Sequence, residues 1–290
     1  MVDTGEWEKN NELPFECIMK KKLPSRKIRV QFGDSRTIRG IEIRMPDKES
    51  SFVWLHWPKG IPRPVFDEAA EYHAVRVGIQ PRRTLCYEHA YKYSGRIHPV
   101  EEVTPDDIQR ILDITTELYG AHNTKKYGTP MCLANDYRNF YECINEHSDN
   151  EDQFGTLNDV ICWVVGATRT LKIRDKPHDK KTKGEREIIS IELPEGIYIM
   201  RGRSFQQHYT HEFPRLYDGW FKKFLSVADE WIGDSDMRFL EKAAWISRHP
   251  KRIKNEIKHE KVRGEDFNYD EAFDIWNQRR TSYTIRYFKN

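Results

Sequence analysis

No stretch of this sequence approaches the roughly 20 consecutive apolar residues that a bilayer-spanning helix requires. Residues 1–22 are polar and charged, and they lack the apolar core of a secretory signal peptide. Both absences predict a soluble protein inside the cell, in the nucleus or the cytoplasm, without a membrane partner.

Cysteine is scarce and irregularly spaced. The five cysteines are Cys17, Cys86, Cys132, Cys143 and Cys162, and no two of them form a CxxC pair. This odd, scattered set argues against a disulfide framework and against a zinc cluster, and it is typical of a reducing compartment.

A large excess of one charge is also missing, because 48 Lys and Arg face 46 Asp and Glu, for a formal charge of +2. Any binding to nucleic acid must therefore depend on local patches. Charged residues make up 32% of the chain and hydrophobic residues 38%, which is ordinary for a soluble globular protein. The length of 290 residues allows one large domain or two small ones.

The first 99 residues divide into a polar beginning and a strand-like part. Residues 1–27 end in several Lys and Arg, and we expect a solvated tail there rather than a nucleic-acid-binding arm. From residue 28, short strand-like segments alternate with Gly and Pro: KIRVQFG, TIRGIEIRM and SFVWLHW.

One helix is clearly indicated at residues 104–119. Thr104 is a good N-cap, Pro105 suits the first position, and Asp106 and Asp107 favour the positive end of the helix dipole. Gly120 ends the apolar periodicity. We expect this helix to pack on a sheet.

Strand-like residue patterns return over residues 131–213. Residues 159–166 are almost continuously apolar, as in a strand buried on both faces, whereas residues 168–174 alternate with the period of a half-buried strand. Residues 175–187 read as a charged loop, and residues 188–194 and 196–200 as further strands. Many short strands without helices between them predict a sandwich, a jelly roll or a barrel.

Helical periodicity then occupies residues 216–276, and a last strand-like run, SYTIRYF, follows. A helical block between two strands of one β-domain predicts an insertion. We therefore expect a mainly β protein with helices (α+β). Its expected parts are a domain over 28–290 with an N-terminal part (28–130), a core (131–215 and 277–290) and the insertion (216–276).

The segment NEHSDNE contains a His and an Asp two residues apart, His147 and Asp149. Such a pair shares one side of an extended chain, and with a distant His it can form a facial triad that binds iron. The spacing alone is weak, because this composition predicts about one such pair by chance. His211 and His208 are the two candidates for the distant ligand.

Several short motifs follow one another in a recognisable order. Pro81-Arg82 precedes YKYSG (91–95), and the triplet NDY (135–137) begins twelve residues before His147. GATRTLKIR (166–174), the HEFP that begins at His211, and RTSYTIR (280–286) complete the series. On these motifs the chain resembles the AlkB family of nucleic-acid dealkylases, before and after residues 216–276.

The resemblance implies an Fe(II)- and 2-oxoglutarate-dependent dioxygenase that uses O2, with a double-stranded β-helix (jelly-roll) core. The residues that match the family's iron ligands are His147, Asp149 and His211. The residues that match its 2-oxoglutarate contacts are Asn135, Tyr137, Arg280 and Arg286. Arg280 matches the arginine that binds the distal carboxylate, a role that suits a bidentate, always-charged guanidinium. Without the motif order, both arginines would be interpreted as exposed charges on an edge strand.

The residues that match the family's base pocket are Tyr91, Tyr93, Ser94 and Glu151. An aromatic ring that stacks on a base contributes roughly 1–3 kcal/mol, although a strand tyrosine is more often a core residue. Glu151 matches an acid that can accept a hydrogen bond from a base edge.

The chain departs from the family pattern in two places. Asn150 stands where many of these dealkylases carry a second acid, which puts a cationic methylated base in doubt as the substrate. His211 and Arg280 are also 69 residues apart, whereas the family has a much shorter connection. Within this insertion, residues 248–263 are basic. We hypothesise that they contact phosphates; a solvated helix face and a contact with a protein are the alternatives.

The resemblance thus implies an oxidative demethylase of alkylated DNA or RNA bases, as in DNA repair, that releases succinate, carbon dioxide and formaldehyde. We expect a monomer. One alternative is an oxygenase of the same fold that acts on another substrate, such as a protein or a lipid. The other is a catalytically silent scaffold that binds nucleic acid.

Overall fold

A computed structural model of the 290-residue chain describes most of the β-domain. The described residues are 17–19, 23–32, 36–66, 82–93, 96–119, 128–138, 142–154, 159–177, 186–202, 204–214 and 279–288. The helical insertion predicted for residues 216–276, with its basic stretch 248–263, lies outside these ranges.

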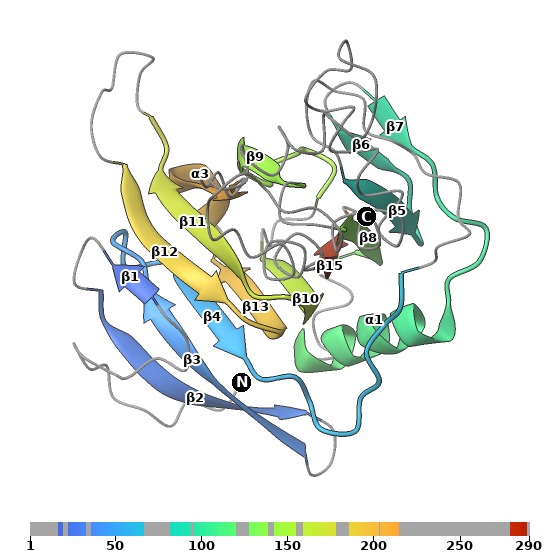
Figure 1. The fold of residues 1–290 in the computed structure, drawn as a ribbon, viewed down its shortest axis with the longest axis horizontal. Helices are drawn as coiled ribbons and strands as arrows, with labels where there is room; N and C mark the ends of the chain where they lie inside the picture. Colours follow the sequence, from blue (N-terminus) through green and yellow to red (C-terminus); the bar gives the residue numbers. More distant parts are fainter. Residues whose placement is uncertain are drawn as a thin grey trace, which may run out of the picture.

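The described strands form two antiparallel sheets that face each other (Figure 1). The larger sheet has the order β2 (Ser25–Phe32), β3 (Arg36–Arg44), β4 (Ser51–Leu55), β13 (Gly196–Arg201), β10 (Val160–Gly166), β15 (Arg280–Tyr287), β8 (Pro130–Tyr137) and β5 (Arg83–Tyr87). The smaller sheet has the order β1 (Cys17–Met19), β12 (Glu187–Leu193), β11 (Arg169–Asp175), β14 (Tyr209–Phe213) and β9 (Ile144–His147). A separate hairpin pairs β6 (Tyr91–Tyr93) with β7 (Arg96–His98). This mostly β architecture is consistent with the predicted jelly roll.

Apolar side chains fill the space between the two sheets and also cover the outer face of the larger sheet. Between the sheets, Trp54 and Cys162 pack with Leu171 and Ile191 of the smaller sheet. On the outer face, the apolar side of helix α1 (Asp106–Tyr119) packs against Trp163, whose indole N–H donates to the Thr115 hydroxyl. Strand β10 is covered on both faces, which explains its continuous run of apolar residues. The prediction of a strand buried on both faces at residues 159–166 is confirmed.

The other strand predictions are also confirmed, with small shifts at their ends. Residues 169–174 alternate between buried and half-buried positions, as the period of two predicted. The predicted helix begins at Asp106 rather than at Thr104. The expected N-cap role of Thr104 is wrong, because the first backbone bond of the helix, from Gln109, goes to the carbonyl of Pro105 and places Pro105 at the N-cap. The Thr104 hydroxyl donates to Glu88.

The prediction of a solvated tail over residues 1–27 is corrected in two places. Residues 17–19 form strand β1, which pairs with the edge of β12, and Leu23 is buried between the sheets. Strand β2 begins at Ser25, and Arg26 pairs with the buried carboxylate of Glu42. Strand β1 satisfies the backbone hydrogen bonds along this edge of β12, which a local pattern rich in charges does not reveal.

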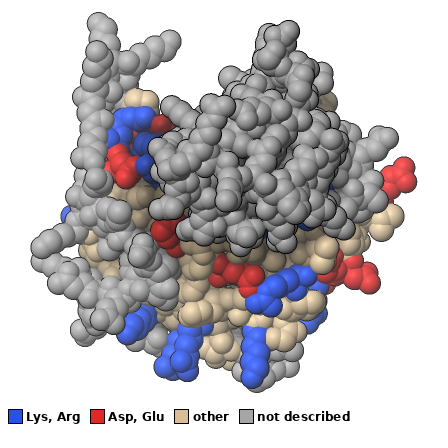
Figure 2. All heavy atoms as spheres, in the orientation of Figure 1, with Lys and Arg blue, Asp and Glu red and all other residues tan. Residues whose placement is uncertain are grey.

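Charged side chains of both signs are distributed over the described surface. On the face seen in Figure 2, basic and acidic side chains of the described residues are interspersed. Among the described residues, the structure has no helix that is both long and apolar enough to span a membrane.

Candidate metal centre and adjoining cavity

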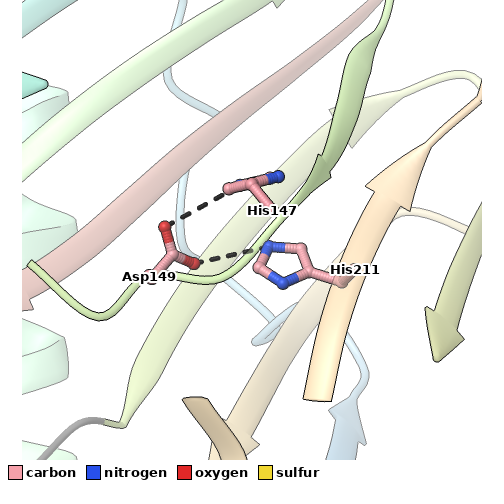
Figure 3. A group of neighbouring side chains, drawn as sticks. All are labelled: His147, Asp149 and His211. Atoms are coloured by element: carbon pink, nitrogen blue, oxygen red, sulfur yellow. Dashed lines mark ion pairs between the residues drawn. The ribbon is translucent and has the colours of Figure 1, made fainter. Parts of the chain in front are cut away.

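Two neighbouring strands at the edge of the smaller sheet bring two histidines together. In the antiparallel pair of β14 with β9, His211 lies directly opposite His147. Asp149 follows two residues after His147, on the loop that leaves β9. Figure 3 shows the three side chains pointing toward one another, one from each strand and one from the loop.

The three side chains are close enough to hold one metal ion. One ligand atom from each lies within 4.8 Å of the other two. The Nε2 atom of His211 is 3.3 Å from one Asp149 carboxylate oxygen, and that of His147 is 3.8 Å from the other. Two imidazoles and one carboxylate form the donor set of the facial triad that binds Fe(II) and leaves positions open for other ligands.

The electrostatic surroundings keep these groups in the forms that bind a metal. Burial opposes ionisation of Asp149, but nearby positive charge, that of Arg286 first, outweighs burial and lowers the pKa of this carboxyl. Burial and the neighbouring His147 lower the pKa of His211 to about 3, so its ring is neutral near pH 7. His147 donates its Nδ1–H to the Asn145 carbonyl at 2.8 Å, which leaves the Nε2 lone pair for a metal.

The alternative ligand, His208, lies apart from this cluster. It is the exposed last residue of the short helix α3 (Phe205–His208), whereas His211 is buried in the next strand. The geometry therefore favours His211 as the distant ligand.

A cavity opens beside the three side chains, between the two sheets. Its lining comes from both sheets, the β6 hairpin and the adjoining loops: Arg82, Tyr91, Leu133, Asn135, Tyr137, Ile144, His147, Asp149, Val160, Cys162, Tyr198, Met200, His211, Phe213, Ser282 and Thr284. Asn135 and Tyr137, which were predicted from the resemblance, are among these residues.

Arg280 is a buried cation next to this cavity. It is only 1% exposed, in a strand flanked by β10 on one side and β8 on the other, so the alternative of an exposed charge on an edge strand is excluded. Its Nη1 donates to the carbonyls of Ala167 (3.0 Å) and Leu193 (2.7 Å). Within the described part of the chain, its Nε and Nη2 have no hydrogen-bond partner.

Two unsatisfied N–H groups on a buried guanidinium are energetically costly unless an anion meets them. Although burial lowers the pKa of Arg280 to about 10, the group is still charged near pH 7. Its guanidinium carbon is 5.1 Å from the ring centre of Phe213, which lines the cavity. This chemistry fits the distal carboxylate of 2-oxoglutarate.

Arg286 takes part in a second polar cluster near the metal ligands. One of its Nη atoms is 3.5 Å from the Asp149 carboxylate, and the other pairs with Glu151. The Tyr91 hydroxyl donates to the same Glu151, and the Arg286 guanidinium lies 3.5 Å over the Phe154 ring. Arg286 is thus buried like Arg280, and the alternative of an exposed edge charge is excluded for it too.

The residues that match the base pocket are only partly described. Tyr91 is buried, lines the cavity and has a raised pKa, chiefly through burial. Glu151 is half-buried beside it. The side chain of Tyr93 and all of Ser94 lie outside the described residues.

Several cavity residues were missed by the sequence analysis. Arg82 donates to the Asn135 side-chain oxygen at 2.9 Å, and Cys162 contacts the Thr284 hydroxyl at 2.9 Å. A usable signal existed for the last strand, because residues at even spacing from Arg280 share its face. Ser282 and Thr284 follow from that rule.

Comparisons with known proteins agree with this donor set. A family model described as the 2OG-Fe(II) oxygenase superfamily matches residues 60–269, which is most of the chain. Alpha-ketoglutarate-dependent dioxygenase alkB homolog 3 of Homo sapiens is 29% identical over 141 residues, or 48% of this chain and 47% of that protein. The protein of the same name from Bos taurus is 28% identical over 205 residues, or 62% of this chain and 70% of that protein. The chain spans about half the length of the human relative.

Proposed function

Because this chain belongs to the 2OG-Fe(II) oxygenase superfamily and is AlkB-like, we propose that it is an oxidative demethylase of alkylated nucleic-acid bases. One observation carries the proposal. Two imidazoles and a carboxylate meet beside a cavity, next to a buried guanidinium with two N–H groups that have no partner among the described residues.

The residues of the triad would hold Fe(II), and Arg280 would bind the distal carboxylate of 2-oxoglutarate. Bound Fe(II), with 2-oxoglutarate and O2, supplies oxidation of a substrate C–H bond, and 2-oxoglutarate becomes succinate and carbon dioxide. Asp149 contributes the negative charge that a divalent cation needs, because the charge of Arg286 above all keeps its pKa low despite burial. Neutral His211 contributes a lone pair.

Polar side chains along the cavity would orient the cosubstrate. Burial raises the pKa of Tyr137, so its hydroxyl keeps its proton and can donate a hydrogen bond. Asn135 is held by Arg82, which fixes the direction of its amide. These groups come from one end of β8 and from the residue before β5, close to the start of β15.

The nucleic-acid part of the proposal is supported by the resemblance of the YKYSG and HSDNE segments to the AlkB base pocket. Tyr91 and Glu151 lie at the cavity and hydrogen-bond to each other. A base that has left its stack could bind between such an aromatic ring and the metal centre.

A second candidate is an oxygenase of the same fold with a substrate other than nucleic acid. The charge of Glu151 is balanced by Arg286, and Asn150 carries no charge. A cationic methylated base would therefore meet less free negative charge here than a pocket with a second acid would offer. This observation keeps a neutral substrate, such as a protein or lipid group, as the alternative.

The test is to measure succinate and formaldehyde together. The protein is supplied with Fe(II), 2-oxoglutarate and single- or double-stranded DNA and RNA oligonucleotides that carry N-methylated bases. We expect formaldehyde in step with succinate on at least one substrate, and neither product from the Asp149→Asn variant. Succinate without formaldehyde on every oligonucleotide would favour the second candidate. Absence of both products would favour a silent scaffold.

A further inference from the structure

The backbone of Asp149 is held by a side chain from a distant part of the sequence. Asp149 lies beyond the end of β9, so the ladder between β9 and β14 does not fix it. Its backbone N–H donates to the side-chain oxygen of Gln206 at 2.8 Å, across 57 residues of sequence. This bond joins the loop that carries the acidic metal ligand to helix α3.

The Gln206 side chain is fully buried and has little else to bind. Its exposed fraction is 0%. Its amide N–H2 group lies 3.8 Å from the sulfur of Met200, which is a weak acceptor. Among the described residues, the bond to Asp149 is therefore the single strong hydrogen bond of this side chain.

Helix α3 is itself fixed on several sides. Before it, the Ser204 hydroxyl donates to the Asp47 carboxylate at 3.0 Å and contacts the Ser50 hydroxyl at 2.8 Å. Phe205 is fully buried between the sheets. Lys176 makes two hydrogen bonds to the helix: its side-chain ammonium donates to the Gln206 carbonyl, and its backbone N–H donates to the His208 carbonyl. Such anchoring gives Gln206 a defined position from which to hold a neighbour.

The same helix also leads directly into the strand that carries the second imidazole. His211 follows Gln206 by five residues, in strand β14. One anchored segment therefore positions two of the proposed metal ligands. It is continuous with the strand that carries His211, and it holds Asp149 through the hydrogen bond from the Asp149 backbone N–H to the Gln206 side chain.

We propose that Gln206 is a positioning residue of the metal centre, which orients the Asp149 carboxylate toward the two imidazoles by holding the Asp149 backbone. The inference rests on the proposed function, because it requires that the triad binds a metal. Removal of a side chain that hydrogen-bonds to a metal ligand typically lowers the affinity for the metal by about 10–100-fold.

Three substitutions isolate the hydrogen bond from the packing. Gln206→Met keeps the length of the side chain and removes the acceptor. Gln206→Glu keeps an acceptor oxygen whether or not the carboxyl is ionised. Gln207→Met makes the same chemical change at the exposed neighbouring position and serves as the matched control.

The primary measurement is Mn(II) binding to each full-length protein, followed by electron paramagnetic resonance without cosubstrate or turnover. We expect Gln206→Met to bind Mn(II) about 10–100-fold more weakly than the wild type. Gln206→Glu should recover most of the affinity, and Gln207→Met should match the wild type. If Gln206→Met does not fold, Gln206→Asn, whose side chain is too short to reach, takes its place.

A second measurement follows amide hydrogen exchange in the metal-free proteins. Loss of the acceptor should speed exchange of the Asp149 amide selectively. The inference is overturned if Gln206→Met binds Mn(II) as tightly as Gln207→Met does, or if Gln206→Glu is as impaired as Gln206→Met. A wild-type protein that binds no Mn(II) would instead contradict the metal centre and hence the proposed function.

Discussion

His147 and His211 are cross-strand partners in the β9–β14 ladder, with ring centres 4.2 Å apart. The register of this ladder sets the spacing of the two imidazoles, because a slip by one residue would move one ring to the other face. The register shifts between His211 and Phe213, just after the pair. The metal centre thus depends on local strand pairing as much as on the loop that carries Asp149.

Removal of one imidazole should weaken metal binding severely. His211→Ala leaves two of three ligands. The affinity for Mn(II) should therefore fall by more than the roughly 100-fold that is typical when a residue that only holds a ligand is removed. His208→Ala, three residues earlier and exposed, is the control and should bind Mn(II) normally. Equal binding by both variants would rule out His211 as a ligand.

Arg280→Lys should weaken the use of 2-oxoglutarate specifically. A lysine keeps the charge but cannot present the two N–H groups, Nε and Nη2, that lack partners among the described residues. Loss of one charge-assisted hydrogen bond, about 1.5–3 kcal/mol, corresponds to a rise of roughly 10–100-fold in KM for 2-oxoglutarate.

The measurement is initial succinate formation against 2-oxoglutarate concentration. Arg63→Lys makes the same change at a side chain 54% exposed that pairs with Glu195, and its KM should equal that of the wild type. An unchanged KM in Arg280→Lys would show that Arg280 does not bind the cosubstrate.

Asp136 should contribute strongly to stability, because it joins three strands. Its buried carboxylate accepts from Arg83 of β5 (2.6 Å) and from Arg279, just before β15 (2.7 Å). Asp136→Asn leaves Arg83 buried without its counter-charge, and the free energy of unfolding should fall by about 3 kcal/mol.

Denaturant unfolding measures this loss. Glu195→Gln, which removes the charge from the exposed pair with Arg63, should lower the free energy of unfolding by under about 1 kcal/mol. Equal losses in the free energy of unfolding would contradict this prediction, because the buried cluster around Asp136 would then stabilise the protein no more than the exposed pair does.

Glu146 should make stability depend on acid pH. Its hydrogen bond from Arg186 outweighs burial and, with the bond from Thr210, lowers its pKa below the ordinary value of 4.5. A lowered folded-state pKa gives stability that is present above pH 4.5 and is lost as the pH falls through the folded-state pKa.

The wild type should therefore be more stable than Glu146→Gln near pH 7, and the difference should shrink below pH 4.5. Unfolding curves over a pH series test this expectation. A difference that stays constant into strong acid would contradict the assigned ion pairs.

Much of the fold could be predicted from the sequence because period and burial are local signals. Residues 160–166 and 169–175 show this well, since one is apolar throughout and the other alternates. The burial of Arg280 could not be predicted from the residues beside it in the sequence. Its burial follows from the central place of β15 in the sheet, which only the order of the strands determines.

The site was predictable only where motifs mark it. The three triad residues came from a short motif together with a resemblance, whereas Gln206 belongs to a four-residue helix that is too short for a periodic signal. Its contact with Asp149 spans 57 residues and arises from the way α3 packs. Arg82 was likewise missed as a cavity residue, because its role depends on the pairing of β5 with β8.

The most direct test of the central claim is an anaerobic titration of the protein with Fe(II) in the presence of 2-oxoglutarate, followed by visible absorption. The account predicts a charge-transfer band that saturates at one Fe(II) per chain and is absent from Asp149→Ala and His211→Ala. Failure of the wild type to develop the band, or an undiminished band in both variants, would contradict a metal centre at His147, Asp149 and His211.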